Sequence, residues 1–232
     1  QNMRKMSTVL RAISKGETKM KFNTKLLHGK AGRNTPDGAT LPGISQVSAF
    51  SYDSAEHLEK VFGNKAPGFA NTRIGNPTVA AFEQRINEVE GGTGAVACAS
   101  GMAAITVALL NVLSAGDEII AGSGLFGGTI DLFKDLEAFG ITTHFIPHIT
   151  VEDIKPVLNQ NIKAVFGEII GNPGLDVVNI KEVSDFLHEN GVPFIVDATT
   201  ATPYLINALA AGADIVIHSS SKYINGSGNA IS

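Results

Sequence analysis

Residues 193–222 read "PFIVDATTATPYLINALAAGADIVIHSSSK", in which two short apolar runs flank a helical pattern at 204–211. The runs "PFIVD" and "DIVIH" are apolar through their centres, which is typical of strands covered on both faces of a sheet. A strand, a helix and a second strand in this order predict a parallel pair with a helical crossover. Asp197 and Lys222 then follow neighbouring strands at the same edge of the sheet, where α/β proteins bind their ligands.

The same alternation extends toward the N-terminus. Further strand candidates are the runs "AVACA", "DEIIA", "ITTHFI" and "IKAVFGEI". Helical patterns lie between them, at 101–113, 127–139, 151–159 and 180–189. Strands that alternate with helices predict an α/β fold built on a mostly parallel sheet wrapped by helices.

The composition is that of a globular chain. Of 232 residues, 44% are hydrophobic and 17% charged, enough for a sizeable core, and the net charge of -4 gives no sign of a nucleic-acid surface. Cys98 is the only cysteine, so an intramolecular disulfide is excluded and a reducing, cytoplasmic location is expected. Residues 91–116 are uncharged and long enough for a membrane span, but Ser100, Gly101 and Asn111 interrupt them. A strand, a turn and a buried helix are expected there, and no membrane partner.

Charge is uneven along the chain. Residues 1–33 hold nine of the eighteen Lys and Arg residues and a single acid, Glu17. We therefore expect a basic arm at 1–21, then a less regular N-terminal segment at 22–75. The α/β domain is expected to occupy 76–232.

Two glycine motifs follow strand candidates. "SGMAAI" opens a helix whose free N–H groups and dipole suit a phosphate. "GSGLFGG" matches G-x-G-x-x-G at Gly122, Gly124 and Gly127, so a dinucleotide site is an alternative. The acid expected about twenty residues further on is missing, which argues against that alternative.

One cofactor needs the groups at this edge. Pyridoxal 5'-phosphate takes a Lys for its Schiff base, a carboxylate beside its pyridine nitrogen and an anion site for its phosphate. Lys222 and Asp197 supply the first two, and the hydroxyls of Ser219 and Ser221 contribute to the third. The alternative is structural, with Asp197 as a helix N-cap or in an ordinary ion pair.

The order of the motifs makes the prediction more specific. "TRIGNPT", "ASGMAAI", "LFGGT", "GNP", "VDATTATP" and "HSSSKYINGSG" follow one another along the chain. In this order they resemble the Cys/Met-metabolism family of pyridoxal-phosphate enzymes, the group related to cystathionine γ-synthase. The stretch "AEHLEKVFGNKAPGFANTRIGNPT" is most similar to the O-acetylhomoserine sulfhydrylase branch. The resemblance implies the large domain of the aspartate-aminotransferase-like fold (fold type I), with a C-terminal domain missing from this chain.

The resemblance also implies a role for each site residue. Lys222 would form the Schiff base and shuttle protons, Asp197 would hold the pyridine nitrogen, and Phe126 would stack on the ring. Arg73 would reach the phosphate of a neighbouring subunit, to which 22–75 contributes, so a homotetramer made of two active dimers is expected. The other implied cofactor-binding residues are Gly101, Met102, Ser219 and Ser221 at the phosphate, Asn172 near the ring hydroxyl, and Thr199.

Three positions distinguish this chain within the family. Asn71 and Phe126 stand where the family usually has Tyr, which removes two phenols that bind phosphate or tune proton transfer. The ring of Phe126 still provides a face for stacking. Gly128 stands where methionine γ-lyases carry a Cys, which disfavours that activity.

The expected reaction is a γ-replacement in methionine biosynthesis, in which O-acetylhomoserine and sulfide give homocysteine and acetate. Cystathionine γ-synthase or a γ-lyase of the same family is the alternative within this class. A catalytically weak cofactor-binding or assembly protein is the alternative of another class. No metal is expected, and the partners are an amino-acid substrate, a sulfide or thiol donor, and further copies of the chain. Because the family's Arg for the substrate carboxylate lies in its C-terminal domain, these 232 residues alone are expected to turn over substrate poorly.

Overall fold

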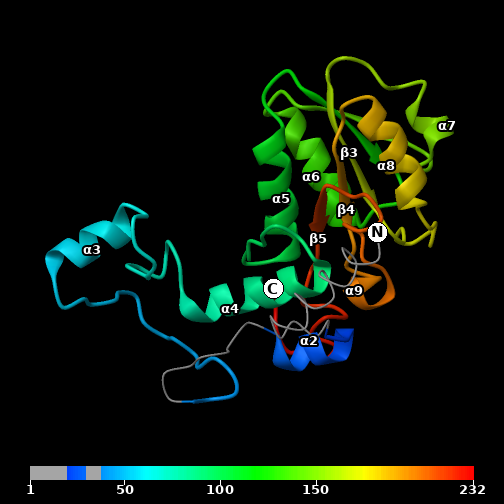
Figure 1. Cartoon of the computed structure of the whole chain (residues 1–232). Helices are drawn as coiled ribbons and strands as arrows, with labels where there is room; N and C mark the ends of the chain where they lie inside the picture. The colour runs from blue at the N-terminus through cyan, green and yellow to red at the C-terminus, as the bar shows by residue number, and fades with distance from the viewer. Residues whose placement is uncertain (1–19, 30–37) are drawn as a thin grey trace, which may run out of the picture. The chain divides into compact units, whose positions relative to one another are not determined.

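The computed structural model describes residues 20–29 and 38–232 (Figure 1). All of the predicted basic arm except its last two residues lies outside the described residues. The chain divides into two compact units, Gln1–Val89 and Glu90–Ser232. The boundary predicted after residue 75 stays a prediction.

The second unit is built on a five-stranded parallel sheet (Figure 1). Its strands are paired in the order β2-β1-β3-β4-β5, and all four pairings are parallel. The bounds are β1 Glu118–Gly122, β2 Thr142–Ile146, β3 Ile162–Glu168, β4 Phe194–Asp197 and β5 Ile215–Ile217. The predicted α/β fold with a parallel, helix-covered sheet is confirmed, and Asp197 pairs with Ile217 on the neighbouring strand.

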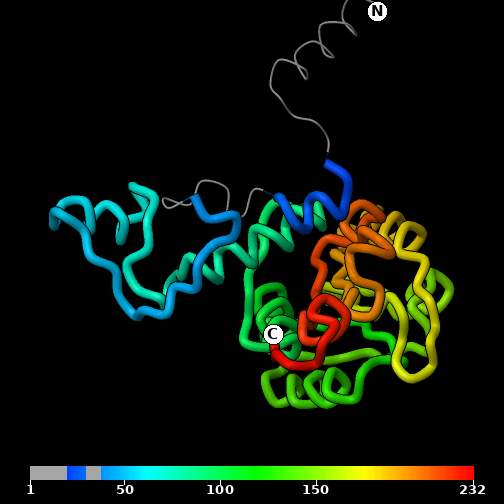
Figure 2. The backbone as a smooth tube through the Cα atoms, turned by 90° about the horizontal axis from the view of Figure 1, so that it is seen from below, coloured from blue at the N-terminus to red at the C-terminus, as the bar shows by residue number. Residues whose placement is uncertain are grey.

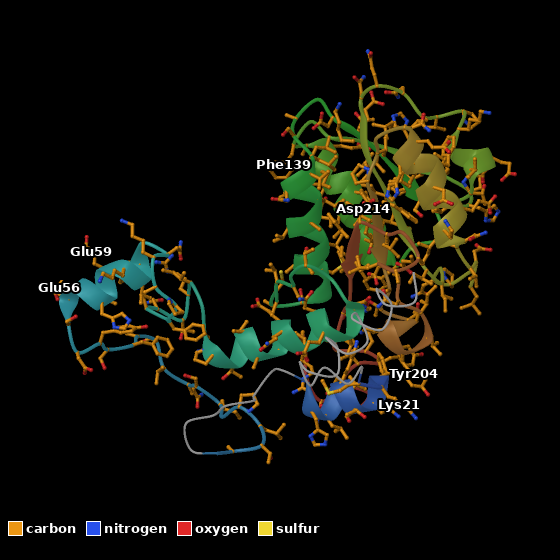
Figure 3. The ribbon with its side chains drawn as sticks, in the orientation of Figure 1. Lys21, Glu56, Glu59, Phe139, Tyr204 and Asp214 are labelled. Atoms are coloured by element: carbon orange, nitrogen blue, oxygen red, sulfur yellow. The ribbon has the colours of Figure 1, made fainter. Side chains whose placement is uncertain are left out.

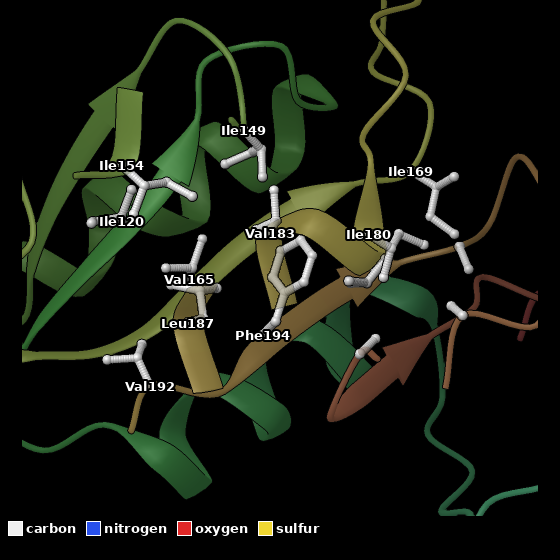
Figure 4. Close-up of a cluster of buried hydrophobic side chains, with 14 of the residues drawn as sticks. Ile120, Ile149, Ile154, Val165, Ile169, Ile180, Val183, Leu187, Val192 and Phe194 are labelled. Atoms are coloured by element: carbon white, nitrogen blue, oxygen red, sulfur yellow. The ribbon is translucent and has the colours of Figure 1, made fainter. Parts of the chain in front are cut away.

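Helices cover both faces of this sheet. The bounds are α5 Gly101–Val112, α6 Gly127–Glu137, α7 Val151–Ile154, α8 Ile180–Glu189 and α9 Thr202–Leu205. Helices α5 and α6 lie on one face, and α8 lies on the other (Figure 1). Successive strand side chains point to opposite faces, so Ile119 packs in the cluster of α5 and α6, while Ile120 packs in that of α8. Figure 4 shows the second cluster, in which Phe194 lies close to Val183.

Polar groups fix the start of the last two strands. One oxygen of Asp214 (Figure 3) accepts a hydrogen bond from the backbone N–H of Phe194 at 2.8 Å and lies 2.9 Å from Nε2 of His188. Because His188 belongs to α8, the carboxylate joins this helix to β4 and to the entry of β5.

The first unit contains three described helices, α2 Phe22–His28, α3 Ala55–Phe62 and α4 Pro77–Glu90, the last residue of which belongs to the second unit. The guanidinium of Arg85 donates to the carbonyl of Lys25 at 2.8 Å, which ties α4 to α2. No helix among the described residues is long and apolar enough to cross a membrane.

Three sequence expectations were wrong in detail. In the described part of the chain, residues 95–99 belong to no strand, and Val96 is 79% exposed, so this apolar run is not core. Helix α7 ends at Ile154, well before 159, because Pro156 cannot donate a helical hydrogen bond. Helix α9 ends at Leu205, and no helix continues to 211. The backbone is extended at Ile206 (φ -148°, ψ 135°), and the residues after it form a turn in which the side chain of Asn207 accepts from the N–H of Ala210.

Gly212 provides a test of the packing between α8 and the loop before β5. Its φ is +118°, and a Cβ there would lie 2.1 Å from Oγ of the buried Ser184. We expect Gly212→Ala to lower the free energy of unfolding by about 2–4 kcal/mol, because backbone strain and a buried clash add together. Urea unfolding would measure this, with Gly94→Ala as the control because a Cβ at Gly94 meets no atom within 4 Å. Equal midpoints for the two variants would contradict the prediction.

Candidate active site

The carboxyl ends of the strands hold most of the residues singled out from the sequence. Strand β1 has β2 on one side and β3 on the other, and the helices that follow β1 and β3 cover opposite faces. The strand order changes direction between these two strands, which is the position where α/β sheets bind ligands. Phe126 lies in the loop after β1, and Asp197 ends β4.

A chain of hydrogen bonds joins the loops after β4 and β5. The backbone N–H of Thr199 donates to Oδ1 of Asp197 at 2.8 Å. The hydroxyl of Thr199 accepts from the backbone N–H of Ser219 at 2.8 Å. These three residues, predicted separately from the sequence, are thus brought together by their own contacts.

Asp197 is a carboxylate at the end of a buried strand. Burial raises its pKa above the usual range, while hydrogen bonds from Thr199 and the nearby His218 act in the opposite direction. A cationic partner beside Asp197 would remove this cost of burying its charge. The carboxylate is therefore suited to hold a protonated ring nitrogen.

The N-terminus of α5 lies against Ser219. A Cβ at Gly101 would be 2.6 Å from Cβ of Ser219, so only glycine allows the helix to start this close to the loop after β5. The side chain of Ser100 accepts from the N–H of Ala103, and the earlier N–H groups, including that of Met102, have no acceptor within the helix. Free N–H groups at the start of a helix are suited to bind an anion, and these lie beside Ser219.

The hydroxyls of Ser219 and Ser221 converge on one oxygen atom. They donate to the carbonyl oxygen of Ser232 at 3.5 Å and 3.0 Å, respectively. Figure 2 shows how the C-terminal segment folds back beside the loop after β5. Two hydroxyls that share one acceptor are suited to a phosphate oxygen.

Lys222 has an exposed side chain, and within residues 20–29 and 38–232 no hydrogen bond or ion pair involves its Nζ. Its backbone is fixed, because its N–H donates to the carbonyl of Ser219 at 3.2 Å and its carbonyl accepts from Gly226 at 2.8 Å. A free amine on a fixed turn is suited to a covalent bond with a carbonyl ligand.

Sequence reasoning missed Glu168, the last residue of β3. Its Oε1 accepts the backbone N–H of Phe126 at 2.7 Å, and it pairs in register with Asp197. Burial raises the pKa of Glu168 to about 7, the Asp197 carboxylate adds to the rise, and the N–H of Phe126 lowers it. A carboxylate at the end of an apolar strand was the available signal, the same one that identified Asp197.

Phe126 lies at the start of α6 and is 51% exposed. A Cβ at Gly128 would be 2.8 Å from Cε1 of this ring and 3.6 Å from the sulfur of Met102. Asn172 follows β3, and its backbone N–H donates to the carbonyl of Gly124 at 3.2 Å while its side chain is exposed. The loops after β1 and β3 are thereby joined.

Arg73 belongs to the first unit, whereas the other predicted site residues belong to the second. The side chain of Asn71 accepts from the backbone N–H of Arg73 at 2.9 Å, and its carbonyl accepts from Ile74 and Gly75. Asn71 therefore fixes the turn that carries Arg73, which a phenol could not do in the same way.

His218 is buried, as expected for a packed histidine, but its partner was not predicted. Its Nε2 lies 2.5 Å from Oε1 of Glu90, and both side chains are 6% exposed. The two residues are 128 positions apart in the sequence. Among the described residues, Nδ1 of His218 and Oε2 of Glu90 have no hydrogen-bond partner.

A parallel sheet whose edge offers an anion site, a buried carboxylate and a free lysine is typical of enzymes that bind pyridoxal 5'-phosphate. Residues 23–232 match the model of the Cys/Met metabolism PLP-dependent enzyme family, and the chain belongs to that family. The family and its cofactor, both predicted from the motifs, are confirmed.

Two relatives with different activities have similar sequence identities to the chain. It is 37% identical to the O-acetyl-L-homoserine sulfhydrylase of Leptospira meyeri over 91% of its own length and 48% of that protein. It is 38% identical to the L-methionine γ-lyase of Fusobacterium nucleatum subsp. polymorphum over 90% of its length and 53% of that protein. The chain thus spans about half the length of these relatives.

A crystal structure from Campylobacter jejuni supports the fold. That protein is described as an O-acetylhomoserine (thiol)-lyase and contains a pyridoxyl-lysine-5'-monophosphate residue. It superposes on this chain with a TM-score of 0.86 at 31% identity, covering 91% of this chain and 52% of that one. The predicted branch is therefore represented among both the sequence relatives and the solved structures.

Proposed function

We propose that the chain is the pyridoxal-phosphate-binding part of an O-acetylhomoserine sulfhydrylase, which converts O-acetylhomoserine and sulfide to homocysteine and acetate. The observation that carries the proposal is the continuous set of contacts from Asp197 through Thr199 and Ser219 to Gly101. It places a carboxylate and the start of a helix on one rigid frame. This frame matches the two ends of the cofactor, a ring nitrogen and a phosphate.

The phosphate end of the frame fits an anion. The absence of a Cβ at Gly101 lets the first N–H groups of α5 lie beside Ser219, and the hydroxyls of Ser219 and Ser221 share one acceptor. In the proposal, these groups and the N–H of Met102 hold the phosphate. Arg73 from a second copy of the chain adds a positive charge, so the active unit is a dimer, and two dimers form the tetramer.

In the proposal, three side chains hold the pyridine ring of the cofactor. Asp197 keeps the proton on the ring nitrogen, Phe126 covers one face of the ring, and Asn172 lies near its hydroxyl. When bound, pyridoxal 5'-phosphate supplies an electron sink for a carbanion next to the substrate amine. Thr199 holds Asp197 in place through the bond described above.

Lys222 carries the covalent link and the protons. Its amine would hold the carbonyl carbon of the bound cofactor, and when a substrate amine takes that place, the free Nζ would accept the proton from Cα of O-acetylhomoserine. Removal of a second proton at Cβ would let acetate leave from Cγ, hydrosulfide would add at Cγ, and protons would return to Cβ and then to Cα to give homocysteine. A primary amine on an exposed, flexible stem can reach both carbons in turn.

Gly128 supports γ-replacement over γ-elimination from methionine. In related methionine γ-lyases a Cys stands at this position, whereas here the ring of Phe126 occupies the space next to Gly128, 2.8 Å from the position of a Cβ. A thiol at this position would require the ring to move. The proposal includes a cytoplasmic location, in keeping with the free thiol of Cys98.

A product screen tests the proposal. The protein that contains this chain is loaded with pyridoxal 5'-phosphate and given O-acetylhomoserine with sulfide, O-succinylhomoserine with cysteine, or methionine alone, and products are identified by mass spectrometry. We expect homocysteine and acetate from the first mixture as the main reaction. Cystathionine or an α-keto acid as the main product would instead identify the synthase or the lyase. Bound cofactor without any product would indicate a cofactor-binding protein that is not an enzyme.

A further inference from the structure

We propose that Glu168 is a positioning residue that fixes Phe126 against the cofactor ring, a role that rests on the proposed function. Phe126 is the N-cap residue of α6 and has no polar side chain with which to cap the helix. Its carbonyl accepts from Thr129 at 2.9 Å and Ile130 at 3.2 Å. Its N–H is held from outside the helix by Oε1 of Glu168 at 2.7 Å.

These contacts fix Phe126 at both of its peptide groups. With its carbonyl tied into α6 and its N–H tied to β3, the direction of its Cα–Cβ bond is set. Phe126 remains 51% exposed, which leaves its side chain accessible for stacking. Gly128 leaves the space in which this ring lies.

The position of Glu168 in the sheet links this contact to the site. Glu168 and Asp197 are register partners on β3 and β4, and the N–H of Ile169 donates to the carbonyl of Asp197 at 3.0 Å. The residue that covers the ring and the residue that holds the ring nitrogen are therefore placed by adjacent strands. Glu168 is only 9% exposed, and among the described residues its carboxylate makes a single hydrogen bond, the one to the N–H of Phe126.

Two substitutions separate the hydrogen bond from the charge. Glu168→Gln keeps the length of the side chain and an oxygen acceptor for the N–H of Phe126 but removes the charge. Glu168→Asp keeps the charge but is one methylene shorter and should not reach. If Glu168 acts by positioning, the Gln variant behaves as the parent and the Asp variant does not.

The chain contains no tryptophan, so Phe126→Trp introduces a single fluorescent reporter at the site. In that background without cofactor, we expect Glu168→Asp to increase the motion of the indole in time-resolved anisotropy, and Glu168→Gln to leave it unchanged. Titration with pyridoxal 5'-phosphate quenches the reporter. The dissociation constant should rise about tenfold in the Asp variant and change less than about threefold in the Gln variant.

The two readouts keep the inference separate from the proposed function. Equal indole motion in the parent, Asp and Gln proteins would overturn the positioning role whether or not the cofactor binds. If the Gln variant showed the same increase in indole motion and in dissociation constant as the Asp variant, the positioning role would also be overturned. The charge of Glu168, and not its hydrogen bond, would then be what matters. The expected change in indole motion without any quenching by pyridoxal 5'-phosphate would support the role of Glu168 and contradict the proposed function. If Glu168→Asp does not fold, Glu168→Leu replaces it, since it too leaves the N–H of Phe126 without an acceptor.

Discussion

Replacing Lys222 with Ala should abolish covalent attachment of pyridoxal 5'-phosphate to the chain. The parent protein, loaded with the cofactor and reduced with borohydride, should carry a pyridoxyl group on the peptide that contains Lys222. The Ala variant should carry none, and its turnover should be lost, because no other group in the proposal moves protons between Cα and Cβ. Absorbance and peptide mapping by mass spectrometry provide the measurement.

Lys155→Ala is the matched control. Lys155 is also exposed, but it lies at the C-cap of α7 and has no proposed role. Its removal should leave both the adduct and the turnover as they are in the parent. A pyridoxyl group found on a lysine other than Lys222 in the parent protein would overturn the assignment of the site.

Replacing Asp197 with Asn should separate the stability of the protein from its function. Asn keeps an oxygen that accepts the N–H of Thr199, so the frame of the site is preserved. It cannot hold a proton on the ring nitrogen by charge. We expect turnover to fall on the order of 10²-fold, as for the loss of one preorganised electrostatic group, and cofactor retention on dialysis to fall as well.

Without cofactor, the same variant should be at least as stable as the parent at neutral pH. The pKa of Asp197 is raised in the folded state, so between its unfolded pKa and its folded pKa the native chain binds more protons than the unfolded chain. The contribution of Asp197 to the free energy of unfolding therefore falls as the pH rises through this window. Because Asn does not titrate, the Asp197→Asn variant does not lose stability in this way. Thermal unfolding of the cofactor-free proteins at pH 4 and pH 7 measures it, with Asp185→Asn on the surface of α8 as the control. A marked loss of stability at pH 7 in Asp197→Asn would contradict the explanation.

The sheet and its ligand-binding edge were predictable because they follow from hydrophobic pattern. Apolar runs such as 162–168 favour a strand covered on both faces, and their order sets which residues meet at the carboxyl edge. Asp197 and Lys222 were found in this way from sequence position alone. The roles of the individual site residues, including Arg73, remain predictions for the experiments above.

The features that were missed depend on contacts between distant segments. The partner of Glu168 is a backbone N–H 42 residues away, and no sequence pattern marks a backbone group as a partner. The run at 95–99 was wrongly predicted as a strand because an apolar pattern does not reveal whether neighbouring strands are available for pairing. The helix expected at 204–211 ends early because the backbone is extended at Ile206, and the side chain of Asn207 then caps a separate turn, neither of which the apolar pattern reveals.

The bond between Glu90 and His218 has a consequence for how the chain folds. It closes a loop of 128 residues, and the entropy of such a closure must be lost before the contact can form. Each parallel pairing in the sheet also joins segments separated by a crossover, and contacts of this kind form slowly. The loop after β5, which carries Ser219 and Lys222, follows directly on His218, so we expect it to reach its final position only when the rest of the sheet is assembled. The order of folding would then keep the reactive amine away from the anion site until the surrounding scaffold is complete.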